Sequence, residues 1–158
     1  MAICQLCLRE KQLIKKSHII PDFIYESLYN SEHKLIRFNP FDLSNGNKNK
    51  TYLPTGEYEG GLLCADCDNR ILGGYENYAS KVLKGGLSSS NVPQIKQYRS
   101  TEGTEFTEIK NIDYCKFKLF LLSILWRGHI STRPMFNEIN IGTNAEIIRK
   151  ESQRWQWC

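Results

Sequence analysis

CQLC at residues 4–7 and CADC at residues 64–67 are the two stretches that decide the fold. In each C-x-x-C pair a tight turn can bring two sulfur atoms to the same side. Two such pairs supply the four thiolate ligands of a closed, tetrahedral structural zinc site. We therefore expect one Zn²⁺ ion that joins the start of the chain to a distant segment, with these ligands: Cys4, Cys7, Cys64 and Cys67.

Two other interpretations of these cysteines remain open, namely buried free thiols and a redox-active dithiol. A redox C-x-x-C pair typically follows a strand in a βαβ context, which a pair almost at the start of the chain does not fit well. Zinc would contribute strongly to folding there, because a few terminal residues cannot hold themselves in place. Cys115 lies in an apolar segment and is expected in the core, while Cys158 carries no signal.

Length and composition predict one globular domain over residues 1–158. The chain is 41% hydrophobic and 24% charged, which is typical of a domain with a packed core. The most apolar run, Phe117 to Trp126, is interrupted by Lys118 and Ser123 and falls short of the roughly 18 apolar residues of a membrane span. The start of the chain lacks a secretory signal pattern, so we expect a cytoplasmic protein without membrane association.

A cluster of basic residues precedes His18. Arg9, Lys15 and Lys16 are its members with the clearest potential for phosphate contacts. The net charge of +4 permits a polyanionic partner without requiring one. The cluster is therefore either a nucleic-acid contact or simply a solvated loop face.

The first half of the chain predicts short strands and helices. A short extended segment ends at Pro21, since the residue before a proline is biased towards extended backbone. The pattern then predicts a helix over residues 22–30, a turn-rich excursion over residues 39–56 and a short strand over residues 57–63. A helix follows the second cysteine pair, with an interruption at Gly73-Gly74.

The second half predicts a hairpin and two helices. Residues 92–110 alternate as a hairpin, and residues 112–127 form a strongly apolar helix that ends before Gly128. Helical spacing predicts that the core face of this helix consists of Tyr114, Phe117, Leu121, Ile124 and Leu125, widened by Phe120, Leu122 and Trp126. A capping box at residues 143–146 opens a last helix, whose Trp155 and Trp157 are candidates for core packing, a partner contact or base stacking.

The stretch KKSHIIPDFIY at residues 15–25, taken with LLCADCDN at residues 62–69, resembles the zinc-bearing members of the HNH nuclease family. In that family a C-x-x-C pair precedes a histidine that is followed by an apolar residue and proline, and a second pair opens a helix. The resemblance covers residues 1–84 and extends to an uncharacterised subgroup of bacterial and phage-linked proteins. It implies a ββα-metal fold and a role in phage defence or a mobile element.

The resemblance also implies roles for individual residues. His18 would be the general base that activates a water for attack on a phosphodiester, a role suited to an unperturbed histidine pKa near neutrality. Asp68 would hold a catalytic Mg²⁺ or Mn²⁺ ion, since such hard ions prefer oxygen ligands. Glu59 would either orient the His18 ring or bind that metal. The structural alternatives are that His18 caps the strand or packs beside the zinc, that Asp68 caps the helix, and that Glu59 is an ordinary solvated strand residue.

The set of catalytic residues that is typical of the family is incomplete in this sequence. Ser17 stands where the family supplies an aspartate or histidine, and a serine is a poor ligand for magnesium. The sequence therefore also allows a module that binds nucleic acid or protein without cutting. A third hypothesis is a small interaction protein that contacts a partner or a second copy through its Trp155 and Trp157 tail.

The fold expected from all of these features is α+β. A zinc-stapled ββα-metal unit, HNH-like, occupies residues 1–84, and a helical half with a small hairpin over residues 92–158 packs on it within one domain. The expected function is metal-dependent cleavage of nucleic acid, most simply DNA. No recognition helix suggests that this chain reads base sequence alone.

Overall fold

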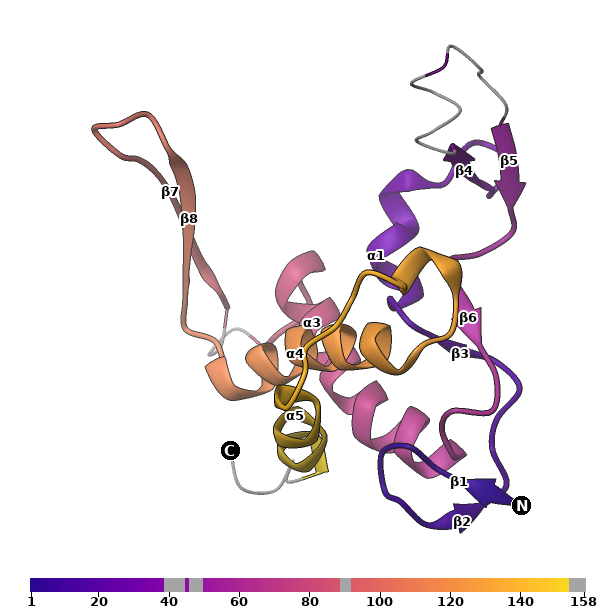
Figure 1. The fold of residues 1–158 in the computed structure, drawn as a ribbon. Coiled ribbons are helices and arrows are strands. Elements are labelled where there is room, and N and C mark those ends of the chain that lie inside the picture. The colour runs from indigo at the N-terminus through magenta and orange to yellow at the C-terminus, as the bar shows by residue number, and fades with distance from the viewer. Residues whose placement is uncertain (39–44, 46–49, 89–91, 154–158) are drawn as a thin grey trace.

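The computed structural model describes residues 1–38, 45, 50–88 and 92–153. Small strand pairs and short helices make up the N-terminal half, and longer helices with a projecting hairpin make up the rest (Figure 1). The chain is thus a mixed α+β structure, as its sequence predicts. Among the described residues, no helix combines the length and the apolar character needed to cross a bilayer.

Two short antiparallel strand pairs contain or adjoin the first cysteine pair and His18. β1 (Ala2–Ile3) pairs with β2 (Glu10–Lys11), and the first C-x-x-C pair lies in the turn between them. β3 (Ser17–His18) pairs with β6 (Tyr58–Glu59), in a register that places His18 opposite Tyr58. The strand expected over residues 57–63 is therefore present but shorter than predicted.

The segment between β3 and β6 forms a helical turn and a second hairpin. α1 (Asp22–Tyr25) starts directly after Pro21 and continues as the 3₁₀-helix η1 (Glu26–Leu28), close to the predicted helix over residues 22–30. β4 (Leu35–Phe38) pairs with β5 (Lys50–Leu53). The pair of β4 and β5 lies away from α3, α4 and α5 (Figure 1), and most of the excursion predicted over residues 39–56 lies outside the described residues.

The second cysteine pair opens a helix of two parts. η2 (Asp66–Leu72) is wound as a π-helix and runs directly into α3 (Gly73–Lys84). The predicted interruption at Gly73-Gly74 is wrong. Gly73 has helical torsion angles (φ −60°, ψ −28°), and its N–H donates to the Asp68 carbonyl five residues earlier, which is the π-helical bond. The helix ends at Gly85, whose φ of +84° suits a glycine.

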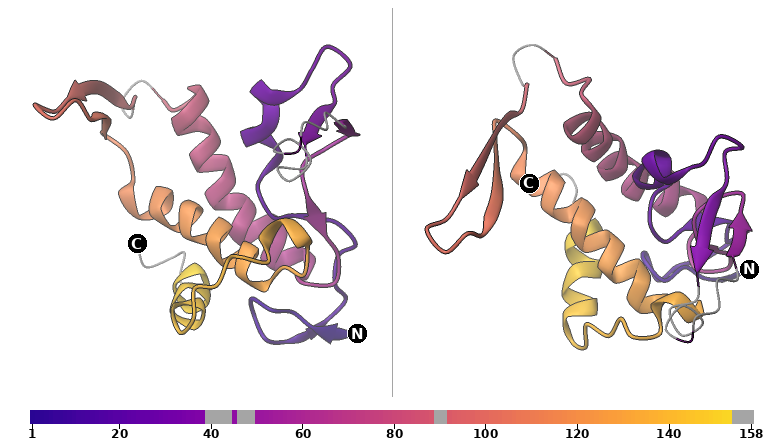
Figure 2. Two further views of the ribbon diagram at one scale, coloured as in Figure 1. Left: turned by 45° about the horizontal axis from the view of Figure 1, so that its top comes forward. Right: turned by 90° about the horizontal axis from the view of Figure 1, so that it is seen from above.

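The core joins the two halves of the chain. α4 (Tyr114–Ile130) packs against α3 and against α5 (Asn144–Gln153), and η4 (Pro134–Phe136) connects α4 to α5 (Figures 1 and 2). The buried hydrophobic cluster includes Leu6, Leu63, Tyr75, Phe120 and Ile148. The Tyr75 hydroxyl donates to the carbonyl of Ser152 at 2.9 Å, which fastens α3 to α5.

The buried face of α4 agrees with the prediction only in part. Tyr114, Leu121 and Leu125 are 70%, 50% and 45% exposed, so they do not form the core face. Phe120 and Trp126 are buried as expected, and three further predicted residues pack against the core while partly exposed: Phe117, Leu122 and Ile124. The prediction missed the other buried residues, Leu119, Ser123, Arg127 and Gly128. Apolar residues surround this helix on nearly all sides, so their spacing does not single out one face. Polar groups with buried partners, described below, orient it instead.

α4 also extends beyond its predicted end. Gly128 lies inside the helix rather than after it. A Cβ atom at Gly128 would lie 2.8 Å from Ile139 Cδ1, so the glycine makes room for the segment that returns towards α5.

The predicted hairpin over residues 92–110 is confirmed. β7 (Gln94–Arg99) pairs with β8 (Glu105–Lys110), and the ribbon projects from the helices in all three views (Figures 1 and 2). Tyr98 and Phe106 stack on one of its faces with centroids 5.2 Å apart. Most of its side chains are exposed.

Replacing Gly73 by alanine should leave the fold intact and raise the free energy of unfolding by up to about 1 kcal/mol, because alanine is the better residue inside a helix. A Cβ at this position meets only the Asp68 carbonyl oxygen, at 3.4 Å. Gly60→Ala is the contrasting variant, because its Cβ would lie 2.4 Å from the Lys15 carbonyl oxygen. It should destabilise by roughly 1–3 kcal/mol. Urea unfolding compares the two, and a strongly destabilised Gly73→Ala would contradict a continuous helix.

Candidate functional site

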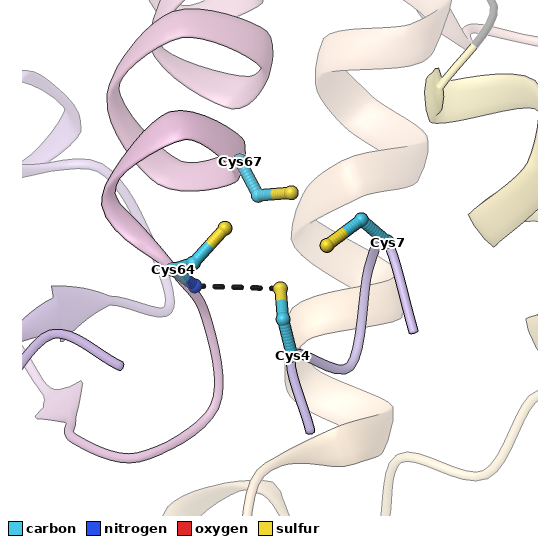
Figure 3. Close-up of side chains that lie close together, drawn as sticks. All are labelled: Cys4, Cys7, Cys64 and Cys67. Atoms are coloured by element: carbon cyan, nitrogen blue, oxygen red, sulfur yellow. Dashed lines mark hydrogen bonds between the residues drawn. The ribbon is translucent and has the colours of Figure 1, made fainter. Parts of the chain in front are cut away.

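Four cysteine side chains from two distant segments converge on one point (Figure 3). Cys4 and Cys7 come from the turn between β1 and β2, whereas Cys64 and Cys67 come from the beginning of the helix that contains η2. The four sulfur atoms all lie within 4.8 Å of one another. Their predicted convergence is confirmed. Among the described residues, this is the one cluster of three or more histidine, cysteine or acidic side chains close enough to share an ion.

Backbone hydrogen bonds hold the two cysteine segments together. The N–H of Gln5 donates to the Leu62 carbonyl, and the N–H of Ile14 donates to the Leu63 carbonyl, both at 2.9 Å. The N–H of Cys64 donates to the Cys4 sulfur at 3.3 Å, the dashed line in Figure 3. These bonds bring the two cysteine segments side by side.

Helix α5 supports the first cysteine segment from the other end of the chain. The Leu6 carbonyl accepts hydrogen bonds from Arg149 Nη1, at 2.7 Å, and from the Gln153 side chain. Arg149 is in turn held by Glu146 at 2.7 Å. The first cysteine turn is thereby tied to the C-terminal half of the described chain.

The cysteine cluster fits a structural zinc ion. Zn–S bonds of about 2.3 Å place the sulfurs of a tetrahedron about 3.8 Å apart, so sulfurs within 4.8 Å of one another can close on one ion with small shifts. Four sulfur ligands favour zinc and leave no open position for substrate. Cys4 and Cys67 are almost fully buried, which suits a site shielded from water.

The thiols respond differently to their surroundings. Burial tends to raise the pKa of Cys4, but backbone N–H donors from Cys7, Cys64 and Leu6 outweigh it and lower the pKa to about 7. Burial raises the pKa of Cys67, and the neighbouring cysteines raise it further. Gathering four thiolates without a cation is therefore costly, and a divalent ion offsets that cost.

His18 lies at the end of β3 with its ring held by a short hydrogen-bond chain. Its Nε2 atom lies 2.9 Å from Thr55 Oγ1, and Thr55 Oγ1 donates to Asp22 Oδ1 at 3.1 Å. A hydroxyl has one proton to donate, and Thr55 donates it to Asp22, so the Thr55 oxygen accepts a hydrogen bond from Nε2–H of the neutral ring. This hydrogen-bond network assigns the lone pair of the neutral imidazole to Nδ1.

Asp22 anchors this chain. The Tyr29 hydroxyl donates to Asp22 Oδ1 at 2.6 Å. That bond is the main cause that lowers the pKa of Asp22; burial opposes it, while the Thr55 hydrogen bond and the nearby His18 add to the lowering. Sequence reasoning assigned Asp22 only to the start of a helix and did not single out Thr55. The spacing of these residues along the chain gives no sign that they meet.

Asp68 lies against the other side of β3. Ser17 Oγ donates to Asp68 Oδ1 at 2.6 Å, and Ser17 is buried. Successive strand residues point to opposite faces, so the side chains of Ser17 and His18 diverge. Asp68 Oδ2 forms no hydrogen bond within the described part of the chain. The structure therefore joins Asp68 to Ser17 and leaves one of its oxygens available.

Glu59 holds the segment that follows α4. Its carboxylate accepts hydrogen bonds from the Ser131 hydroxyl at 2.6 Å, the Thr132 hydroxyl at 2.6 Å and the Thr132 N–H at 3.0 Å. Burial works to raise the pKa of Glu59, but these donors outweigh it and lower the pKa. The register pairs Glu59 with Ser17, so the His18 ring has Thr55 rather than Glu59 as its partner.

Arg127 links α4 to both α3 and β3. Its Nη1 atom donates to Glu76 Oε1 at 2.6 Å and to the His18 carbonyl at 2.9 Å, and its side chain is 2% exposed. Burial raises the pKa of Glu76 while Arg127 opposes that change, and both Asp68 and His18 lie close enough to act on Glu76 electrostatically. Sequence reasoning missed Arg127, because it follows a run of apolar residues.

The basic residues predicted to contact nucleic acid are dispersed. Arg9, Lys15 and Lys16 are exposed. Arg9 lies near Asp66 on the cysteine side, where its charge acts on that carboxylate, whereas Lys16 lies over the ring of Tyr58. The predictions for Trp155, Trp157 and Cys158 concern residues 154–158, which lie outside the described residues.

Comparison of this chain with protein-family models, with curated proteins and with solved structures finds no match in any of the three.

Purified protein should contain one equivalent of zinc, and Cys67→Ser should lose it. The variant, or wild type treated with a chelator, should melt on the order of 10 °C lower or more, because several kcal/mol of metal binding are lost. Elemental analysis and thermal unfolding measure both effects. Lys11→Ala, an exposed change in β2, should retain zinc and stability. A metal-free wild type with an unchanged melting temperature would contradict the zinc assignment.

Proposed function

We propose that this protein is a metal-dependent endonuclease of the HNH type that hydrolyses phosphodiester bonds in nucleic acid, most simply DNA. The observation that carries this proposal is the hydrogen-bond chain from Asp22 through Thr55 to His18. It leaves Nδ1 of an oriented imidazole ready to accept a proton. Support also comes from the order of the elements, since β3, β6 and a helix fastened by four cysteines follow one another.

In this proposal His18 Nδ1 takes a proton from a water molecule as the water oxygen attacks phosphorus. The P–O bond to the leaving oxygen breaks, and that oxygen takes a proton from solvent. Thr55 keeps the ring in one orientation, and Asp22 stabilises the imidazolium that forms through the shared hydroxyl. Arg127 fixes the backbone of His18 through its carbonyl.

Asp68 is the residue proposed to hold a divalent ion, through its available oxygen, and the phosphate would have to reach both this ion and the His18 ring past β3. Mg²⁺ typically binds one or two carboxylates, several waters and the phosphate of the substrate rather than a complete protein cage. When bound, the ion would offset the charge that builds up on the phosphate and the leaving oxygen. Glu76, 27% exposed and paired with Arg127, is the next carboxylate along the same helix.

A second candidate is a module that binds nucleic acid or protein and does not cut. It is favoured by the partners of two carboxylates: Asp68 is engaged by Ser17, and Glu59 is fully engaged by Ser131 and Thr132. This candidate predicts salt-sensitive binding with no cleavage in magnesium, manganese or any other divalent ion.

The decisive measurement is cleavage of plasmid DNA and of labelled oligonucleotides, with Mg²⁺ or Mn²⁺ added to the zinc-bound protein. His18→Ala should lower the rate by roughly 10²–10⁴-fold, the usual contribution of a general base. It should retain zinc and the wild-type melting temperature.

The control for His18 is Lys96→Ala. Lys96 is an exposed residue of β7, outside the strand pair that carries His18, so cleavage should persist. Wild type that binds DNA but cuts with no divalent ion would overturn the nuclease proposal and favour the second candidate. Equal cleavage by His18→Ala would remove His18 from the mechanism.

Thr55→Val should slow cleavage on the order of tenfold, the value of one hydrogen bond of about 1.4 kcal/mol. The valine leaves Nε2–H without its acceptor and separates the ring from Asp22. Thr55→Ser keeps the hydroxyl and should therefore retain most of the cleavage rate. If Thr55 served only to pack the fold, the presence of this hydroxyl would not decide the rate. Single-turnover rates across pH give the comparison. A fully active Thr55→Val would show that the ring needs no such support.

A further inference from the structure

A second set of side chains lies beside His18 on the same face of the strand pair. Residues directly opposite each other in an antiparallel pair extend their side chains to the same side. The register therefore places the Tyr58 ring on the side occupied by the His18 ring. The two ring centroids are 6.2 Å apart in an edge-on arrangement.

Two cations lie over the Tyr58 ring. Lys16 Nζ is 4.9 Å from the ring centroid and Arg133 Cζ is 6.0 Å from it. Within the described residues, neither Lys16 nor Arg133 forms an ion pair with a carboxylate. Arg133 Nε is also covered and has no hydrogen-bond partner there. Two unpaired cations held by one ring leave positive charge available for a ligand.

The two carboxylates closest in sequence to Tyr58 already have other hydrogen-bond or ion-pair partners. Glu57 forms a salt bridge with Arg37 at 3.0 Å. Glu59 lies close enough for the charge of Arg133 to favour its ionised form, but its oxygens accept from Ser131 and Thr132. Within the described residues neither carboxylate forms a direct ion pair with Lys16 or Arg133, although the charge of Glu59 offsets part of that of Arg133.

A cavity of about 260 Å³ lies beside Arg133. Tyr58 and Thr55, the partner of the His18 ring, also line it. Arg37 and Glu57, which form a salt bridge with each other, line it as well. A group bound in this cavity would lie next to the His18 hydrogen-bond chain.

We propose that Lys16 and Arg133, held over Tyr58, form a binding subsite for a backbone phosphate of the nucleic acid, adjacent to the bond on which His18 acts. This inference rests on the proposed function. The guanidinium of Arg133 can bind two phosphate oxygens at once, whereas Lys16 adds a point charge. Because the cations lie over the Tyr58 ring, the subsite contacts phosphate rather than a base and carries no sequence preference.

The test is binding of fluorescent single-stranded and duplex oligonucleotides to the full zinc-bound chain, measured over a series of salt concentrations without added Mg²⁺. Lys16→Ala and Arg133→Gln should each weaken binding and lower the slope of log K against log [salt] by about one, the value for one lost phosphate contact. If the substitutions weaken binding to the duplex more than binding to the single strand, the phosphate belongs to a duplex. The opposite order assigns it to a single strand. Lys16 is exposed, so its variant should fold normally.

Lys118→Ala is the matched control. Lys118 also lies over a tyrosine ring, 5.9 Å from the centroid of Tyr114. It belongs to the first turns of α4, and that helix begins beside the β7–β8 hairpin, away from β3 and β6 (Figures 1 and 2). Its variant should keep the wild-type slope. Unchanged slopes for both Lys16→Ala and Arg133→Gln, an equal change in Lys118→Ala, or no binding by wild type would each overturn the subsite.

These outcomes are separate from those for the nuclease. If wild type cuts and His18→Ala does not, while Lys16→Ala and Arg133→Gln keep the wild-type slope, then the subsite is wrong and the nuclease stands. If the slopes fall as expected but no divalent ion supports cleavage, the subsite stands and the protein binds without cutting.

Discussion

The joining of two distant cysteine turns is the constraint on which the rest of the structure depends. Neither turn has a core of its own: β1 and β2 are two residues each and exposed. Their position comes from sulfur atoms gathered within 4.8 Å of one another and from backbone bonds between the turns. Because Cys64 and Cys67 also begin the longest buried helical segment of the N-terminal half, this one cluster sets where β3 lies relative to that helix.

The histidine site is assembled from both halves of the chain. β3 and the turn before β6 supply His18 and Thr55, whereas α4 supplies Arg127, which reaches the His18 carbonyl and Glu76. Burying a guanidinium is costly unless it is paired and hydrogen-bonded. Arg127 has these partners only when α3, α4 and β3 are packed together. The helical half therefore determines the geometry around His18.

Features set by local chemistry were predictable from sequence. The cysteine spacing predicted the cluster, and alternation with turn residues predicted the β7–β8 hairpin. Features that depend on long-range partners were not. The exposed Leu121 and Leu125 show that an all-round apolar helix does not reveal its buried face, and Gly73 behaves as a helical residue because π-winding accommodates it. The Thr55 contact with His18 joins positions with no shared pattern.

The carbonyl of Leu6 accepts hydrogen bonds from two side chains of α5. A ribosome makes Leu6 before α5, because α5 lies later in the chain than every other described helix and strand. The first cysteine turn therefore lacks this support until α5 has been made. Docking of α5 then fastens the turn, since side chains at both the middle and the end of that helix hold the same carbonyl.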